Sequence, residues 1–179
     1  MTRRSPLDIE ALWQLERIAS VAIAPDGSAA ACAVTAYSME ENKGVTSLWL
    51  LPTGSRAPRR LTRCGEKDAK PAWSPKGGRI AFLAWREQEG AKDEQAQLYL
   101  IDAAGGEAER VTRFGPGIED FKWMPDGRRI AFVSWVWPDA TGSRGQERRH
   151  KAFGERKESA YVTAEAHYRY FDRNLPMGR

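Results

Sequence analysis

One five-residue stretch of this 179-residue chain comes close to a serine nucleophile elbow, whose pattern is Gly-x-Ser-x-Gly. The stretch is TGSRG, Thr141 to Gly145, in which threonine replaces the first glycine of the pattern. An elbow also needs an apolar strand that leads into the serine, but Ser143 lies in a Gly-, Arg- and Glu-rich segment. We therefore do not expect Ser143 to be a nucleophile, and we predict no catalytic residue in the chain.

The two histidines, His150 and His167, are the next candidates for a general base or a metal ligand. Neither has a His, Cys or carboxylate partner at the spacing that metal sites use. His150 belongs to the charge run ERRHK and is interpreted as a solvated residue, whereas His167 alternates with Tyr168 and Tyr170 as in a strand. The sequence therefore predicts no metal site and no cofactor.

Carboxylate pairs are a third kind of candidate, because two carboxyl groups across a cleft perform general acid–base chemistry. Glu40 with Glu41 and Glu119 with Asp120 are such pairs, but both lie in expected loops between strands. Glu165 matches no motif either. The substrate-binding residues therefore stay unassigned at this point.

The elements that would position any such side chain repeat with a period of 50 residues. WMPDGRRIAFVSW, from Trp123 to Trp135, shares eight of thirteen residues with WSPKGGRIAFLAW, from Trp73 to Trp85. A weaker third copy, IAPDGSAAACAVT, runs from Ile23 to Thr35. A period near 50 residues is typical of repeat architectures, and of propellers in particular.

Each complete unit is expected to form four short antiparallel strands, with a Pro-x-Gly hairpin turn between the first two. Second strands such as IAFLAW are apolar on both faces, which indicates a blade stacked between two others. The expected first strands are Ser20–Ala24, Lys70–Ser74 and Asp120–Met124; the second are Ala29–Thr35, Arg79–Trp85 and Arg129–Trp135; the third are Ser47–Leu51 and Gln97–Asp102; the fourth are Arg59–Arg63 and Glu109–Arg113.

The repeat also gives an interpretation of the cysteines. Cys32 stands where the other units have Phe82 and Phe132, and Cys64 stands where the next unit has Phe114. Both are therefore expected to be small core residues, and two cysteines do not make a disulfide framework. The tryptophans that recur in register are likewise expected to pack between blades: Trp73, Trp85, Trp123 and Trp135.

Two segments lie outside the repeat. Residues 5–17 are expected to form a short helix that Ser5 or Asp8 stabilises at its start, with Pro6 in the first turn and Ile9, Leu12 and Trp13 docked on a blade. Asp139 to Ser159 is rich in Gly, Arg and Glu and is interpreted as a long exposed or disordered insertion. An extended segment is expected after it.

The charge distribution separates the body of the chain from its tail. Residues 1–139 hold 19 Lys and Arg against 19 Asp and Glu, whereas residues 140–179 hold 9 against 5. A neutral body without a recognisable motif argues against nucleic-acid binding. The basic tail nevertheless leaves open the hypothesis of an accessory protein that contacts nucleic acid through residues 140–179, beside the two hypotheses given below. The basic cluster Arg56 to Arg63 is interpreted as a solvated outer strand whose charges block edge pairing.

The hairpin WSPKGGRIAF, the following LYLID and the RVT segment resemble the β-propeller of the prolyl oligopeptidase family of serine peptidases. The bacterial acylaminoacyl-peptidase and dipeptidyl-aminopeptidase-like members are most similar, on the opening DIEALWQLERIASVAIAPDG and the closing ESAYVTAEAHYRYFDRNLPMGR. TolB-type propellers share the hairpin motif. The resemblance implies a propeller that screens and orients peptides above a separate α/β-hydrolase domain with a Ser-Asp-His triad.

The sequence thus predicts an all-β chain, an incomplete β-propeller of four-stranded blades over residues 1–179. The expected parts are a helix at 5–17, blade 1 at 18–66, blade 2 at 67–116, and an incomplete blade 3 at 117–179 with a charged insertion at 139–159. We expect an N-terminal peptidase fragment, truncated before the hydrolase domain and inactive alone; the alternative is a TolB-like protein-binding scaffold. Expected partners are peptides, through a hydrolase domain, and further copies of the chain at the open blade face.

No leader and no membrane span is expected, because the two arginines near the N-terminus precede no apolar run. A cytoplasmic location, without nucleic-acid or membrane partners, is the resulting prediction.

Overall fold

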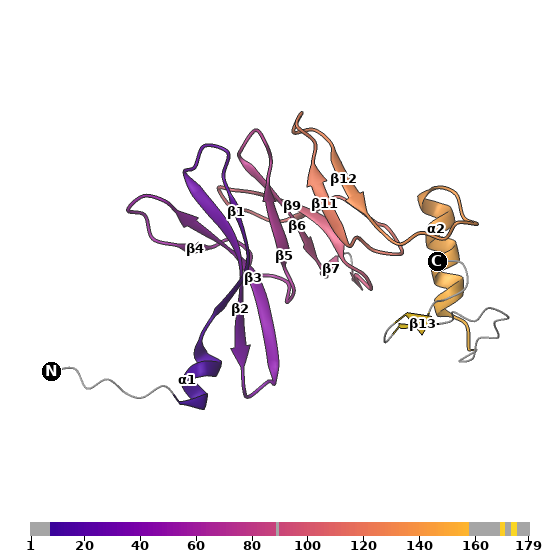
Figure 1. The fold of residues 1–179 in the computed structure, drawn as a ribbon, viewed down its shortest axis with the longest axis horizontal. Coiled ribbons are helices and arrows are strands. Elements are labelled where there is room, and N and C mark those ends of the chain that lie inside the picture. The colour runs from indigo at the N-terminus through magenta and orange to yellow at the C-terminus, as the bar shows by residue number, and fades with distance from the viewer. Residues whose placement is uncertain (1–7, 89, 158–168, 171–172, 175–179) are drawn as a thin grey trace.

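The computed structural model describes residues 8–88, 90–157, 169–170 and 173–174. It is built from antiparallel sheets that stand side by side in chain order, with a helix beyond the third of them (Figure 1). We call these sheets blade 1, blade 2 and blade 3. Within the described residues, no helix is long and apolar enough to cross a membrane.

Blades 1 and 2 are four-stranded, as the repeat predicts, and blade 3 contributes one hairpin. The strand order is β1-β2-β3-β4 in blade 1 and β5-β6-β9-β10 in blade 2. The bounds in blade 1 are β1 (Arg17–Ile23), β2 (Ala29–Ser38), β3 (Lys43–Pro52) and β4 (Arg59–Arg60). Those in blade 2 are β5 (Ala69–Trp73), β6 (Arg79–Ala84), β9 (Gln97–Asp102) and β10 (Glu109–Arg110); blade 3 has β11 (Asp120–Trp123) and β12 (Ile130–Val133).

Two further hairpins lie outside the blades. The loop between β6 and β9 forms a small hairpin that the sequence did not predict, and a second pairs residues near the end of the chain. Their strands are β7 (Glu87–Gln88) with β8 (Ala91–Lys92), and β13 (Arg169–Tyr170) with β14 (Arg173–Asn174).

The three hairpin turns share one backbone conformation. Gly27, Gly77 and Gly127 have φ angles of 71°, 72° and 63°, a left-handed region that only glycine adopts without strain. In the third turn, the Asp126 carboxylate accepts the Arg128 N–H at 2.9 Å. This bond, with the help of the Arg129 side chain, lowers the pKa of Asp126 to about 2. The Pro-x-Gly signal therefore predicted both the position and the conformation of the turns.

The core between blades 1 and 2 matches small side chains with large ones. Ala31 and Ala33 of β2 lie in one apolar cluster with Ile80 and Phe82 of β6, and Tyr99 of β9 joins them. All five side chains are almost fully buried. The short side chains of blade 1 thus leave room for the aromatic residues of blade 2. This complementarity is the physical reason why the copies of the repeat differ in side-chain size.

The other face of blade 2 packs on blade 3. Ala81 and Leu83 of β6 lie in a second cluster with Ile118, and Phe121 and Ile130 of blade 3 cover it. Because neighbouring residues of β6 point to opposite blades, both of its faces are buried, as the sequence predicts. The same expectation was wrong for the outer face of β12, where Val133 is 62% exposed, since no described element covers this face of blade 3. Phe132 lies on the opposite face, edge-on against the Phe114 ring.

Two tryptophans join each blade to the one before it. The Trp73 indole Nε1–H donates to the Ala22 carbonyl at 3.0 Å, and the Trp123 indole donates to the Ala72 carbonyl at 3.1 Å. Both bonds span 51 residues, so they are the same contact one repeat apart. The recurring tryptophans at these two positions therefore lie between blades, whereas Trp85 is half-buried and Trp135 is exposed.

We expect Trp73→Phe to lower the free energy of unfolding by about 1 kcal/mol, because phenylalanine fills much of the space but donates no hydrogen bond. Trp135→Phe is the matched control, since Trp135 is 54% exposed and occupies the other tryptophan position of the repeat. Urea denaturation followed by circular dichroism measures both changes. Equal stabilities of the Trp73 variant and the wild type would contradict the assigned role of the indole.

The short helix α1 (Ile9–Gln14) begins later than expected. Its N-cap is Asp8, whose Oδ1 accepts the Ala11 N–H at 2.8 Å, while Ser5 and Pro6 lie outside the described residues. The docking expected for Ile9 and Leu12 was wrong, because both are exposed. Trp13, the third residue expected to dock, packs edge-on against Tyr37, with 5.8 Å between the two ring centres.

The charged insertion contains a helix, α2 (Gly142–Gly154), so of the two alternatives, exposed or disordered, disorder was wrong for this part, while most of its residues are exposed. Gln146 is buried, and its side-chain amide bonds the backbone N–H and carbonyl of Trp137 at 2.7 and 2.8 Å. The Trp137 ring packs 4.9 Å from the Phe153 ring and 4.9 Å from the Arg149 guanidinium. A single glutamine and two aromatic rings thus order a segment whose overall composition is that of a flexible loop.

Candidate functional site

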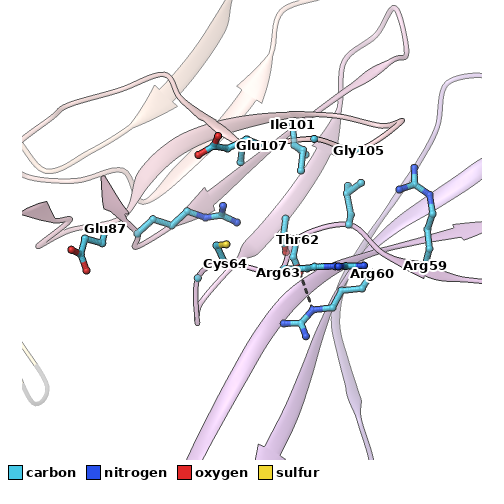
Figure 2. A pocket seen from close by; sticks show the side chains of 14 residues that line it. Arg59, Arg60, Thr62, Arg63, Cys64, Glu87, Ile101, Gly105 and Glu107 are labelled. Atoms are coloured by element: carbon cyan, nitrogen blue, oxygen red, sulfur yellow. Dashed lines mark hydrogen bonds between the residues drawn. The ribbon is translucent and has the colours of Figure 1, made fainter. Parts of the chain in front are cut away.

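A cavity of about 930 Å³ lies between the outer strands of blades 1 and 2. We call it the rim cavity (Figure 2). One wall is the β4 segment of blade 1, and the other combines the end of β9, the loop after it and the end of β6. The lining residues are Arg59, Arg60, Leu61, Thr62, Arg63, Cys64, Gly65, Arg86, Glu87, Ile101, Gly105, Gly106, Glu107 and Ala108.

The basic wall exists because β4 is only two residues long. Five ladder residues were expected from Arg59 to Arg63, but after Arg60 the Leu61 and Thr62 N–H groups both donate to the Leu48 carbonyl. The Thr62 hydroxyl then accepts the Leu48 N–H at 2.8 Å, which holds the chain in this turn. The same contact joins Thr112 to the Leu98 N–H in blade 2 at 2.9 Å.

Two arginines of this wall are fixed by neutral acceptors. The Arg59 guanidinium donates to the Ala103 carbonyl of blade 2, and the Arg60 Nε–H donates to the Thr62 carbonyl at 2.9 Å. Arg63 is exposed at the cavity mouth. Figure 2 shows Glu87 at the opposite end of the cavity from Arg59, with Glu107 also on that side. The cavity is therefore bipolar, with its positive charge concentrated along β4.

The floor behind the rim cavity contains a buried ion pair. Asp68 is fully buried, and its two carboxylate oxygens accept the Arg86 Nε–H at 3.2 Å and the Arg86 terminal N–H at 2.7 Å. Burial raises the pKa of the Asp68 carboxyl, while the Arg86 charge opposes that rise. Two-pronged contact with a fixed guanidinium is the geometry that makes a buried carboxylate tolerable.

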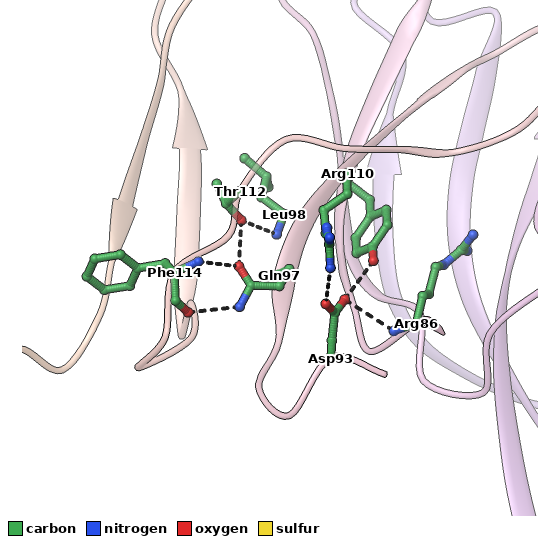
Figure 3. Close-up of polar contacts among 8 residues, drawn as sticks. Arg86, Asp93, Gln97, Leu98, Arg110, Thr112 and Phe114 are labelled. Carbon is green, nitrogen blue, oxygen red and sulfur yellow. Dashed lines mark hydrogen bonds and ion pairs between the residues drawn. The ribbon is translucent and has the colours of Figure 1, made fainter. Parts of the chain in front are cut away.

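Arg86 connects this pair to a second one. Its guanidinium lies 5.0 Å from the Phe82 ring centre and 5.3 Å from the Tyr99 ring centre. The Asp93 carboxylate accepts the Tyr99 hydroxyl at 2.6 Å and the Arg110 guanidinium at 2.5 Å (Figure 3). Burial, together with the bond to Asp93, raises the pKa of the Tyr99 hydroxyl, so Tyr99 stays a neutral donor.

A neighbouring polar cluster fixes the start of β9. The Gln97 side chain accepts the Thr112 hydroxyl at 2.9 Å and the Phe114 N–H at 3.0 Å, and it donates to the Phe114 carbonyl at 2.9 Å (Figure 3). All of its polar atoms are thus used within blade 2. The cluster is therefore structural.

The residues that the sequence singled out for chemistry are not brought together. Ser143 and His150 both lie on α2, where Ser143 is exposed and His150 half-buried; His167 and Glu165 lie outside the described residues. In the part of the chain that the structure describes, no group of three His, Cys, Asp or Glu side chains could hold a metal ion.

Cys32 is buried as predicted, and burial raises the pKa of its thiol. The same prediction was wrong for Cys64, which is exposed on the wall of the rim cavity because the chain leaves the sheet after Arg60.

Sequence reasoning missed the Asp68–Arg86 pair, although the repeat contains its signal. Fifty residues later, the same positions hold Ile118 and Val136. A carboxylate and a guanidinium that replace two apolar residues of a repeat together predict a mutual contact. The pair was not recognised because the repeat was used to find shared residues and not departures from the pattern.

No protein-family model matches the chain. Two curated proteins are similar to it: the uncharacterized peptidase YuxL of Bacillus subtilis, 32% identical over 82 residues, and dipeptidyl-peptidase 5 of Porphyromonas gingivalis, 29% identical over 75 residues. The matched regions cover 46% and 42% of this chain. They span only 12% and 11% of the relatives' own lengths, so this chain corresponds to a small part of either protein.

Solved structures show the same fold at lower identity. Acylaminoacyl peptidase of Pyrococcus horikoshii matches with a TM-score of 0.54 and 18% identity, over 73% of this chain and 20% of its own. A TolB-like protein of Agrobacterium tumefaciens matches with a TM-score of 0.52 and 22% identity, over 66% of this chain and 39% of its own. In fold and in sequence similarity, the chain therefore matches the β-propeller domain of prolyl oligopeptidase-family peptidases.

Proposed function

We propose that this chain is the N-terminal propeller segment of a prolyl oligopeptidase-like serine peptidase of the acylaminoacyl-peptidase type. The observation that carries the proposal is the similarity to two curated peptidases in a chain whose blades stack in propeller order. In this proposal the propeller gates and orients peptides, and a separate hydrolase domain cleaves them. The 179-residue chain alone is expected to be inactive.

The blade geometry supports a role in admitting and orienting a substrate. Strands β1, β5 and β11 begin the three blades, and the tryptophan bonds to Ala22 and Ala72 hold each of them against the next. Lys70 of β5 adds a contact to blade 3, where it donates to the Glu119 carbonyl at 2.7 Å. Strands fixed in this way form a rigid wall, which is what a size-selecting entrance requires.

The second candidate function is a TolB-like scaffold that binds proteins and has no hydrolase domain. The match to the Agrobacterium tumefaciens TolB-like protein is as good in TM-score as the matches to peptidases, so the fold alone does not separate the two. The difference between them is a reactive serine in the same polypeptide.

A fluorophosphonate probe, which reacts with activated serines, separates these candidates. We expect an antibody against this segment to capture, from cells that express the gene, a polypeptide larger than 20.1 kDa that carries the label. Pretreatment with phenylmethylsulfonyl fluoride should abolish labelling, and the purified 179-residue chain should stay unlabelled. Capture of an unlabelled polypeptide would favour the scaffold, and a labelled 179-residue chain would contradict the assignment of catalysis to another domain.

Self-association is proposed through the uncovered faces at the two ends of the stack. Ile18, Val21 and Ile23 of β1 are 59%, 57% and 69% exposed, and blade 3 exposes Val133 on its outer face. Apolar faces of this kind favour a further blade or another copy of the chain. The cytoplasmic location stays a prediction.

A further inference from the structure

The two complete blades each have an arginine at the same position of the repeat, but its surroundings differ between them. Arg110 of blade 2 is 11% exposed and pairs with the Asp93 carboxylate, which Tyr99 also contacts. Fifty residues earlier, the equivalent arginine is Arg60, and the residue in the place of Asp93 is Lys43. Blade 1 therefore keeps the guanidinium of this motif and replaces its carboxylate with a positive charge.

The arginines along β4 form no ion pair of their own, although the Arg60 charge acts on the pKa of the buried Asp68 carboxylate, which Arg86 already binds. Among the residues that the structure describes, no carboxylate lies within 4.0 Å of the guanidinium nitrogens of Arg59, Arg60 or Arg63. Carbonyl groups hold Arg59 and Arg60 in place without neutralising them. Fixed guanidinium groups with uncompensated charge are the usual means by which proteins recognise carboxylates and phosphates.

The surrounding walls leave room for a ligand. Both come from complete blades, and the volume of about 930 Å³ falls in the range of small-molecule sites. Gly105 and Gly106 lie opposite β4 with φ angles of 117° and 116°. These φ angles lie in the region that favours glycine, and a Cβ atom on Gly105 would only be in van der Waals contact with an Arg59 terminal nitrogen, at 3.5 Å.

We propose that the rim cavity binds a small oxyanion, a phosphate or carboxylate group, through Arg60 with help from Arg59 and Arg63. The bound group supplies the arginines of β4 with the negative charge that Asp93 supplies to Arg110 in blade 2. Glu87 and Glu107 repel a long polyanion from the other end of the cavity, which favours a small molecule over a nucleic acid. This site is independent of the proposed peptidase function, because it lies between the outer strands of the blades.

Isothermal titration of the full chain with inorganic phosphate, pyrophosphate or citrate tests the proposal. We expect at least one probe to bind, and Arg60→Gln to weaken that binding about tenfold, the effect of one charge-assisted bond pair. Arg56→Gln is the matched control, because Arg56 is exposed in the same segment but does not line the cavity. Its affinity should stay within about twofold of the wild type, since distant surface charges are screened by salt.

The pattern across the probes identifies the source of the oxyanion. Tighter binding of pyrophosphate supports a phosphorylated ligand, and tighter binding of citrate supports a polycarboxylate. Arg60→Gln should leave the thermal midpoint unchanged, because the Arg60 side chain is exposed, so that a loss of affinity reports on the site. Absence of binding by all three probes, or equal weakening in Arg56→Gln, would overturn the proposal.

Discussion

Replacing Arg86 by methionine is expected to lower the free energy of unfolding by about 3–5 kcal/mol, one of the largest single effects in this chain. The variant leaves the fully buried Asp68 carboxylate without both of its guanidinium hydrogen bonds. It also removes the cation that lies over the neighbouring Phe82 and Tyr99 rings. Urea denaturation at pH 7, followed by tryptophan fluorescence, measures the loss.

The loss in Arg86→Met should shrink as the pH falls. Burial already raises the pKa of Asp68 above 3.8, and removal of the opposing Arg86 charge raises it further. Between the unfolded and the folded pKa, the folded state binds a proton that the unfolded state does not. Acidification through this window therefore stabilises the variant relative to the wild type. A loss that is the same at pH 5 and pH 7 would contradict this origin of the instability.

A double variant tests whether the instability of Arg86→Met comes from the unpaired Asp68 carboxylate or from the loss of the Arg86 side chain itself. Asp68→Ile together with Arg86→Met restores an apolar pair, as at Ile118 and Val136 one repeat later. We expect the double variant to recover most of the stability that Arg86→Met loses, because no charge remains buried alone. A double variant as unstable as Arg86→Met would show that the ion pair itself, and not the orphaned carboxylate, accounts for the loss.

The parts of the fold that could be predicted from the sequence are those whose residues recur in more than one copy of the repeat. The hairpin turns at Gly27, Gly77 and Gly127 and the stacking tryptophans Trp73 and Trp123 recur at an offset of 50 residues. The apolar pattern that predicts the two-sided burial of β6 recurs with them. Local turn chemistry and side-chain patterning determine them, so one sequence suffices.

The features that were missed depend on contacts between segments without a common pattern. The helix α2 is ordered because Gln146 reaches the backbone of Trp137, a contact that composition does not reveal. Cys64 became exposed because β4 ends early, at a bond to the Leu48 carbonyl from another strand. The rim cavity likewise lies between residues of two blades, which no single segment of sequence reveals. The sequence predicted only that the charges from Arg56 to Arg63 lie on a solvated outer strand.

Leu83→Ala and Val133→Ala form a matched pair at the same position of the repeat, and we expect very different results. Leu83 is buried between blades 2 and 3, so its truncation should cost about 2–5 kcal/mol. Val133 is 62% exposed, and the alternation of β12 places it on the face of blade 3 that points away from blade 2. Its truncation in the 179-residue chain should cost about 1 kcal/mol or less.

The same pair tests whether a further blade covers blade 3 in the native polypeptide. A neighbouring blade would bury Val133 as blade 3 buries Leu83, so in that longer protein Val133→Ala should cost about 2 kcal/mol, which approaches the cost of Leu83→Ala. Chemical denaturation of both variants in the 179-residue chain and in the full native polypeptide makes the comparison. A large loss for Val133→Ala in the 179-residue chain, dependent on protein concentration, would instead show that another copy covers this face. A small loss in both contexts would contradict the proposal that the stack continues beyond blade 3.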